Sequence, residues 1–234
     1  MADGRSTARL RPRGKAVTPT PRNLLACARR RTAVLVSAHP RLDPATLRLV
    51  ELELSAGELR ILVSNHSPYE ITGSRTDVTH APIINLDASH PSSRHAVQVI
   101  EPTGSSRMCL LTAGGGASGI HEHSALVHDQ RLVVAVGQRL CALRLPNLDL
   151  EWNVEVDDAT CFGVWYSAKH DCYLSHGELA IARVTLDGTI VWSSGGKDIF
   201  SEGFALHDEY IEVVDFNREK YRIDLSTGSS TIVA

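Results

Sequence analysis

The second half of this 234-residue sequence repeats itself with a period of about 40 residues, which limits the chain to a few architectures. The matching positions are Gly137 and Gly177, Trp152 and Trp192, and Leu145, Leu186 and Leu225. The two glycines and the two tryptophans are each 40 residues apart, and the leucines are 41 and 39 residues apart. Because independent positions keep one period, the sequence predicts a supersecondary unit that is stable only when neighbouring copies stack.

Each copy consists of short apolar runs separated by turn residues, a pattern typical of β-strands. The runs are 132–137, 141–145 and 150–152 in the first copy, 172–177, 181–186 and 190–192 in the second, and 211–217, 221–225 and 231–233 in the third. A fainter copy precedes them, with Ile100-Glu101-Pro102 at the place of Leu145-Pro146. Further strand patterns cover 47–54 and 96–100.

A unit of about 40 residues with roughly four strands matches a propeller blade. We therefore predict an all-β fold, a small or partial β-propeller with no more than four blades in residues 47–234. Such a body is a small closed ring, a partial ring completed by a homodimer, or an open stack. We expect the repeated Trp152 and Trp192 to pack between blades.

The segment RLVVAVGQRLCALRLPNLDLEW, residues 131–152, resembles the repeat of quinoprotein-type (PQQ-like) β-propellers, and YRIDLSTG at 221–228 is similar to the same pattern. The resemblance covers about residues 120–234 and implies the blade fold. It does not imply the quinone cofactor, because those enzymes are much longer and the vicinal cysteine pair they use has no match here. The third copy departs from the pattern, since Ile232 lies near the place of the tryptophan.

Charge divides the chain into two parts. Residues 1–42 contain ten basic groups and one acid, a balance of +9, whereas the rest contains 14 basic and 26 acidic groups, a balance of −12. We interpret 1–42 as a disordered basic tail and 43–234 as the propeller-like domain, because the tail has too little apolar surface to offset its ordering entropy. The tail has two alternative interpretations, an Arg-rich organelle-targeting peptide and an arm that binds nucleic acid or anionic lipid.

The acidic body argues against nucleic acid as its partner. No apolar run approaches the roughly 20 residues of a spanning helix, so we predict no membrane span. Five cysteines are too few for a disulfide scaffold, and the triple arginine at 29–31 interrupts any secretory signal. Free thiols in the cytoplasm are therefore the expected state, with organelle targeting through the basic tail as the alternative.

Alignment of the repeats predicts one polar rim, because the start of each innermost strand lies beside the end of the next antiparallel strand. The residues expected there are His121, His123, Cys161, His176, Glu202 and Asp215. If His121 and His123 lie on a strand, both imidazoles point to the same face. We expect this rim to bind a protein partner or a small ligand, and we expect no cofactor.

The same rim suggests an alternative of another class, a metal-dependent hydrolase or oxygenase. In that case His121, His123, Cys161 and His176 would hold zinc or iron, with Glu202 or Asp215 as a ligand or general base. The competing structural interpretation is that these side chains form hydrogen bonds with the connections between blades.

Two further motif matches involve the glycine-rich segment 114–119. It satisfies the G-x-G-x-x-G pattern, but neither a helix nor an acid after the next strand follows, so we interpret it as a connection and not as a dinucleotide site. The stretch from Gly115 through His121 and His123 also resembles the first half of a cupin metal motif, with His128 at the place of its glutamate. The second half of that motif is absent, so this resemblance only adds to the metal alternative.

Overall fold

The computed structural model describes residues 51–66, 80–88 and 90–233. Within these ranges the chain forms strands and turns and no helix, and no element could cross a membrane as a long apolar helix. The basic segment 1–42 lies outside the described residues, so its interpretation as a tail remains a prediction. The four cysteines within the described ranges, Cys109, Cys141, Cys161 and Cys172, are buried free thiols.

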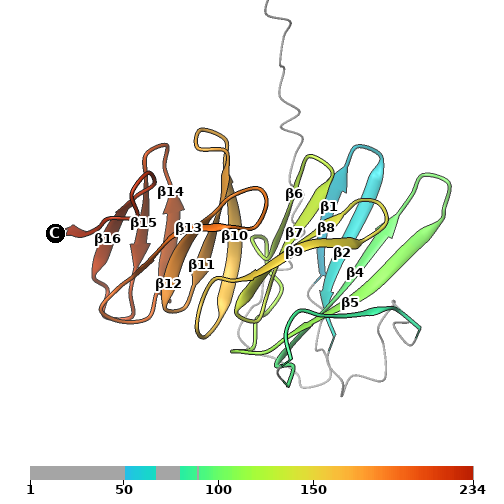
Figure 1. Ribbon diagram of the computed structural model, residues 1–234, viewed down its shortest axis with the longest axis horizontal. Helices are drawn as coiled ribbons and strands as arrows, with labels where there is room; N and C mark the ends of the chain where they lie inside the picture. Colours follow the sequence, from blue (N-terminus) through green and yellow to red (C-terminus); the bar gives the residue numbers. More distant parts are fainter. Residues whose placement is uncertain (1–50, 67–79, 89, 234) are drawn as a thin grey trace, which may run out of the picture. The chain divides into compact units, whose positions relative to one another are not determined.

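The last three sheets are four-stranded antiparallel meanders, in the chain order that the repeat predicts. The second sheet contains β6 (Ala125–His128), β7 (Arg131–Val136), β8 (Arg139–Arg144) and β9 (Asp149–Glu155). The third contains β10 (Cys161–Ser167), β11 (Cys172–Gly177), β12 (Ala180–Val184) and β13 (Ile190–Gly195). The fourth contains β14 (Gly203–Leu206), β15 (Tyr210–Val214), β16 (Lys220–Asp224) and β17 (Ser230–Val233) (Figure 1). The all-β prediction with propeller-like blades is confirmed.

The first sheet has five strands, in the order β1-β2-β4-β5-β3. They are β1 (Glu51–Ala56), β2 (Leu59–Asn65), β3 (Ile83–Asn85), β4 (Ser93–Ile100) and β5 (Ser106–Ala113). β1, β2, β4 and β5 form an antiparallel meander, and β3 adds to β5 in parallel. Ile100 is the last residue of β4, and Leu145 directly follows β8, the corresponding third strand of the second sheet.

Buried apolar side chains lie between consecutive sheets. One cluster joins the first sheet to the second, and includes Val97 and Leu143. A second cluster joins the second sheet to the third, and a third joins the third sheet to the fourth. In the part of the chain that the structure describes, no such cluster joins the fourth sheet to the first. The sheets therefore stack in chain order, as expected for units that cannot bury an apolar face alone.

The repeated tryptophans pack between sheets, as predicted. Trp152 on β9 donates its indole N–H to the carbonyl of Leu186 in the third sheet, at 3.1 Å. One repeat later, Trp192 on β13 donates to the carbonyl of Leu225 in the fourth sheet, also at 3.1 Å. Each indole lies against a turn glycine, Gly188 or Gly228, at which an added Cβ would lie 2.7 Å from the ring.

The register corrects the interpretation of the third copy. Trp192 pairs with Arg183, and the equivalent pair in the fourth sheet is Thr231 with Arg222. Ile232 instead pairs with Tyr221, whose side chain belongs to the cluster shared with the third sheet. The tryptophan of the first two copies is thus replaced by threonine, and the fourth sheet presents a polar side chain at this position.

Candidate functional site

The starts of β6, β10 and β14 and the ends of β7, β11 and β15 form one rim, which we call the inner rim. The pairing of Cys161 with Gly177 and of Gly203 with Val214 places these segments beside one another, as the repeat alignment predicted. Antiparallel pairing alone produces this arrangement, because the end of one strand meets the start of its neighbour. The side chains at this rim differ from the prediction in several ways.

His121 and His123 lie in a turn before β6, and not on a strand, which corrects the expected His-x-His alternation. The Nε2–H of His121 donates to the carbonyl of Phe162 at 2.6 Å. Its Nδ1 accepts the backbone N–H of His123 at 3.2 Å. Both ring nitrogens of His121 are therefore occupied by hydrogen bonds that hold this turn against β10.

Three planar rings form one stack beside the inner rim: His123 belongs to the turn before β6, Trp165 to β10 and Phe204 to β14. The ring of His123 stacks on Trp165, with centroids 4.5 Å apart, and Trp165 stacks on Phe204 at 4.0 Å. The interplanar angle is 26° in both pairs, and all three side chains are half-buried. Offset stacking of this kind is favourable beyond the area that it buries, and aromatic side chains are frequent anchors at interfaces.

His176 on β11 contacts two rings of this stack. Its ring centroid lies 5.1 Å from that of Phe204 and 5.8 Å from that of Trp165. Its Nε2–H donates to the carbonyl of Phe200 at 3.1 Å. Burial lowers the pKa of His176 to about 4, and the nearby His121 and His123 act in the same direction. The imidazole is therefore neutral at neutral pH.

Cys161 and Asp215 are not available at the rim, which corrects their predicted role. The thiol of Cys161 is buried in the cluster between the second and third sheets, and this burial raises its pKa. The carboxylate of Asp215 is also buried and accepts hydrogen bonds from the Glu219 N–H and the Tyr221 hydroxyl, both at 2.9 Å. Period-two alternation assigns a side chain to a face of a strand, but it does not show how deeply that face is covered.

Two exposed side chains complete the rim beside β14 and β15. Glu202 is exposed immediately before β14, as predicted. Phe216 follows Asp215 and is 62% exposed, and the sequence analysis gave it no role. Trp165 and Phe204 were likewise not predicted from the sequence. An available signal was that aromatic residues recur within or beside the inner strands of the last two sheets.

The predicted metal ligands have other partners in this arrangement. In the described ranges, no group of three or more His, Cys, Asp and Glu side chains is placed to hold a metal ion. A metal ion needs the lone pair of a neutral imidazole or a thiolate. Binding by His121 and Cys161 would therefore first require the hydrogen bonds and the packing described above to break. The zinc or iron site remains an untested prediction.

The glycine-rich segment 114–119 is a connection, as interpreted from the sequence, and it packs tightly against residues 159 and 160. The N–H of Gly116 donates to the carbonyl of Ala159 at 2.7 Å, and a Cβ at Gly116 would lie 1.8 Å from the hydroxyl oxygen of Thr160. At Gly115 an added Cβ would lie 2.5 Å from the carbonyl oxygen of Ala159, so glycine is required where these two backbones approach closely. The histidines of the cupin-like stretch do not converge, since His128 lies at the far end of β6 and its Nδ1 forms a hydrogen bond with the Tyr173 hydroxyl.

Comparison with solved structures gives loose likenesses, of which one is described here. No protein-family model and no curated protein sequence matches the chain. The solved structure of BamB from Moraxella catarrhalis is 14% identical, with a TM-score of 0.42, and the match covers 63% of this chain. It spans about half of the BamB chain, namely 48%. A superposition this loose establishes no fold by itself, and the blade architecture rests on the strand pairing described above.

Proposed function

We propose that this chain is a propeller-type interaction module, and that the inner rim binds a partner protein. The observation that supports this proposal is the stack of His123, Trp165 and Phe204, which links the turn before β6 to the third and fourth sheets and remains partly exposed. These rings are already ordered by stacking on one another. Binding of a partner would therefore cost little side-chain entropy at the rim. The exposed Phe216 and Glu202 add an apolar and a charged contact beside this row.

The rim suits recognition better than catalysis. The buried His176 is neutral, and both ring nitrogens of His121 form hydrogen bonds with backbone groups. A nucleophile with an adjacent base, the usual requirement for covalent catalysis, is not found among the rim residues named above. We assign the rim to partner binding on these grounds, since the PQQ-like resemblance implies only the blade fold.

Site-specific photo-cross-linking tests this proposal. A benzoylphenylalanine at Glu202 would report on the inner rim, and the same group at Asp208, an exposed residue beyond the other end of β14, is the matched control. We expect a discrete adduct from Glu202 and none from Asp208. The purified partner should then bind His123→Ala about tenfold more weakly than the unsubstituted chain. Equal cross-linking at both positions would contradict a rim site, and so would an unchanged affinity of the partner for His123→Ala.

Native mass spectrometry of the chain without a metal-binding tag tests the alternative. A bound zinc or iron at one ion per chain would favour the metal-dependent enzyme over the interaction module. We expect no bound metal, because the rim histidine His121 is held by backbone groups. The same spectrum gives the number of subunits and so distinguishes a homodimer from a single chain.

A further inference from the structure

The outer edge of the third sheet is an uncharged strand. In the order β10-β11-β12-β13, β13 pairs with β12 on one side and with no strand of this sheet on the other. Its sequence, Ile190-Val191-Trp192-Ser193-Ser194-Gly195, contains no charged residue. Proteins usually place charged side chains on such edges, and these charges prevent another strand from pairing there. The equivalent edge β9 follows this rule with Asp149, Glu151 and Glu155.

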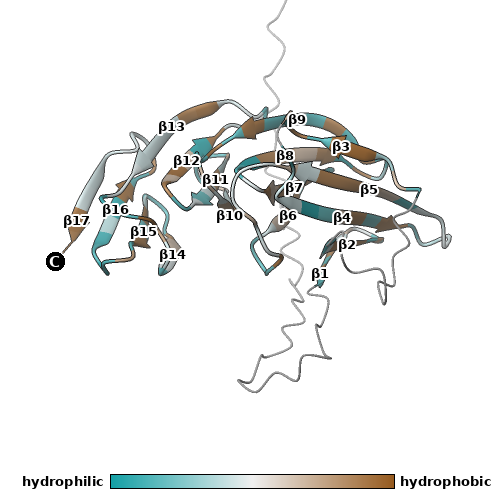
Figure 2. Ribbon diagram, turned by 90° about the horizontal axis from the view of Figure 1, so that it is seen from below, coloured by the Kyte–Doolittle hydropathy of each residue, from teal (hydrophilic) through white to brown (hydrophobic). Residues whose placement is uncertain are grey.

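Aliphatic side chains are exposed along this edge. Ile190 is 38% exposed, Val191 is 50% exposed, and Leu179 in the turn before β12 is 42% exposed. Val191 is the extra residue of a bulge, after which Trp192 to Gly195 pair regularly with β12. Figure 2 shows β13 on the side of the molecule opposite to β10, in brown and pale tones. The edge therefore combines free backbone groups with apolar side chains, and it is separate from the inner rim.

A groove adjoins β13 on the side of the second sheet. It has a volume of about 260 Å³ and lies between the end of β9 and the outer strands of the third sheet. Its lining is apolar at Val156, Leu179, Ala180 and Ile190, with Ser193 beside them. This volume is smaller than the roughly 300–1,000 Å³ of most small-molecule pockets. It suits individual side chains of a peptide that lies along β13.

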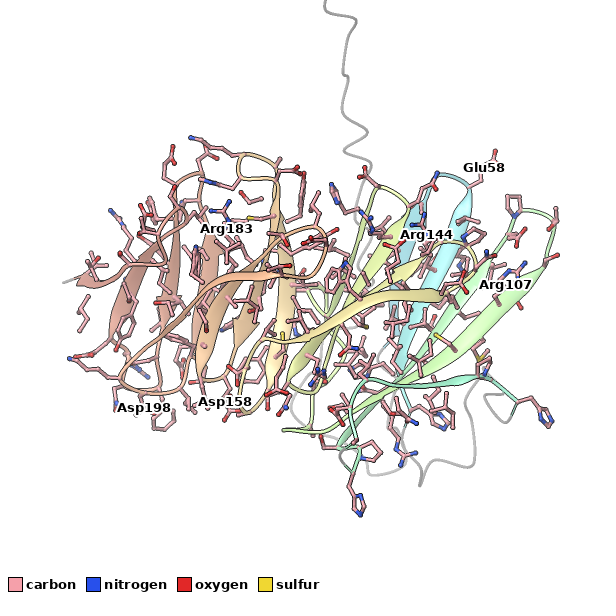
Figure 3. The ribbon with its side chains drawn as sticks, viewed as in Figure 1. Glu58, Arg107, Arg144, Asp158, Arg183 and Asp198 are labelled. Atoms are coloured by element: carbon pink, nitrogen blue, oxygen red, sulfur yellow. The ribbon has the colours of Figure 1, made fainter. Side chains whose placement is uncertain are left out.

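The border of the groove is acidic. Glu155, Asp157 and Asp158 line it, and none of its lining residues is basic. Asp158 is exposed and forms no ion pair with another described residue, whereas Glu155 is paired with Arg139 at 2.8 Å. Figure 3 shows Asp158 and Asp198 at the same end of the molecule, where chain connections join consecutive sheets. Charge complementarity therefore favours a ligand with lysine or arginine beside its apolar residues.

We propose that β13 is a docking edge for an extended peptide segment of a partner protein, with alternating apolar residues and basic flanks. The segment would add to the third sheet as a further strand, so that main-chain hydrogen bonds to β13 supply affinity. Alternate side chains would enter the groove beside Ile190 and Leu179, and the basic flank would lie near Asp158. This site is independent of the proposed function of the inner rim.

Fluorescence anisotropy with the full chain tests this docking edge. The probe is a fluorescein-labelled peptide in which valine alternates with threonine between terminal lysines, and a peptide with serine in place of valine keeps its charge. We expect saturable binding of the valine peptide alone. Val191→Lys, which places a charge on the edge, and Asp158→Lys should each weaken binding by about tenfold or more. Glu58→Lys, a charge reversal at an exposed turn of the first sheet, should leave it unchanged.

Several outcomes would overturn the proposal. These are absence of saturable binding, equal binding of the serine peptide, or equal weakening by Glu58→Lys and Asp158→Lys. Circular dichroism checks that each variant is folded, and Ile190→Ser replaces Val191→Lys if that variant is not. Sedimentation velocity distinguishes a second copy of the chain as the occupant. A dimer that Val191→Lys dissociates would show that β13 pairs with itself and not with a peptide.

Discussion

At the scale of single residues, Gly228 and Trp192 form the contact between the third and fourth sheets. Gly228 has a positive φ of 73°, a region that L side chains rarely adopt, and its missing side chain leaves room for the indole. The Trp152 and Gly188 pair has the same geometry one repeat earlier. The same contact between a tryptophan ring and a glycine without a side chain therefore recurs in two consecutive repeats, 40 residues apart.

Gly228→Ala should destabilise the chain by about 1–3 kcal/mol, because the alanine would be strained at positive φ and would clash with Trp192. In a Trp192→Ala background the same change should cost less, since only the backbone strain remains. Urea unfolding of the two single variants and the double variant measures this coupling. Strictly additive losses would show that the glycine and the indole do not constrain each other.

Two buried histidines make the stability dependent on pH. Burial lowers the pKa of His95 and of His176 to about 4, from an ordinary value of 6.5. As the pH falls below about 6.5, the unfolded chain takes up protons at these residues and the folded chain does not. The free energy of unfolding should therefore fall between about pH 6.5 and pH 4, by something on the order of 3 kcal/mol for each histidine.

His176→Gln should reduce this decline, because glutamine does not titrate. Urea unfolding of the variant and the unsubstituted chain at about pH 7 and about pH 4.5 gives the comparison. Carboxylates contribute to both curves and cancel in the difference. Parallel curves for the two proteins would mean that His176 has the same pKa in the folded and unfolded states.

At the scale of elements, the connection between β9 and β10 is organised by one carboxylate. Asp157 is buried, and its Oδ1 accepts the N–H groups of Ala159 and Thr160 at 2.7 and 3.0 Å. Its Oδ2 accepts those of Leu179 and Ala180, both at 2.8 Å. This side chain therefore links the connection to the start of β12.

Asp157→Ala should destabilise the chain by about 3–5 kcal/mol, because four backbone N–H groups would lose their acceptor in a buried place. The neighbouring Asp158 is exposed, so Asp158→Ala should change the stability by less than about 0.5 kcal/mol. Urea or thermal unfolding of this matched pair measures the difference. Similar losses for both variants would show that the carboxylate of Asp157 is not the organising group.

At the scale of the whole molecule, the outward face of the fourth sheet is polar. Glu212 and Arg222 form an ion pair across β15 and β16 at 3.1 Å, and the Arg222 guanidinium lies 4.0 Å from the ring centre of Tyr210. The opposite face of this sheet holds Ile211 and Ile223 in the cluster with the third sheet. A blade with one polar face can keep that face in water.

Deletion of residues 1–42 should leave the melting temperature of the remaining chain nearly unchanged, because the predicted tail carries little apolar surface. Differential scanning calorimetry of the full and the shortened chain makes the comparison. Thermolysin digestion should cleave within 1–42 before it cleaves the sheets. A drop of several degrees on deletion would show that this segment packs on the domain and that the predicted boundary is wrong.

The sequence by itself determined the class of fold, because strand alternation, turn glycines and the repeated tryptophan are local patterns that recur in each unit. Strand β15, at Tyr210–Val214, overlaps the run expected at 211–217. The sequence also located the inner rim, since antiparallel pairing of neighbouring strands follows from the repeat alignment.

Only the tertiary structure decided which rim side chains are available. Cys161 and Asp215 lie at the predicted ends of strands, yet one is in a core cluster and the other holds a turn. The stack of His123, Trp165 and Phe204 links the turn before β6 to the third and fourth sheets, and its members are about 40 residues apart in the chain. Contacts of this kind depend on how each sheet packs against the next, and no periodicity within one strand contains that information.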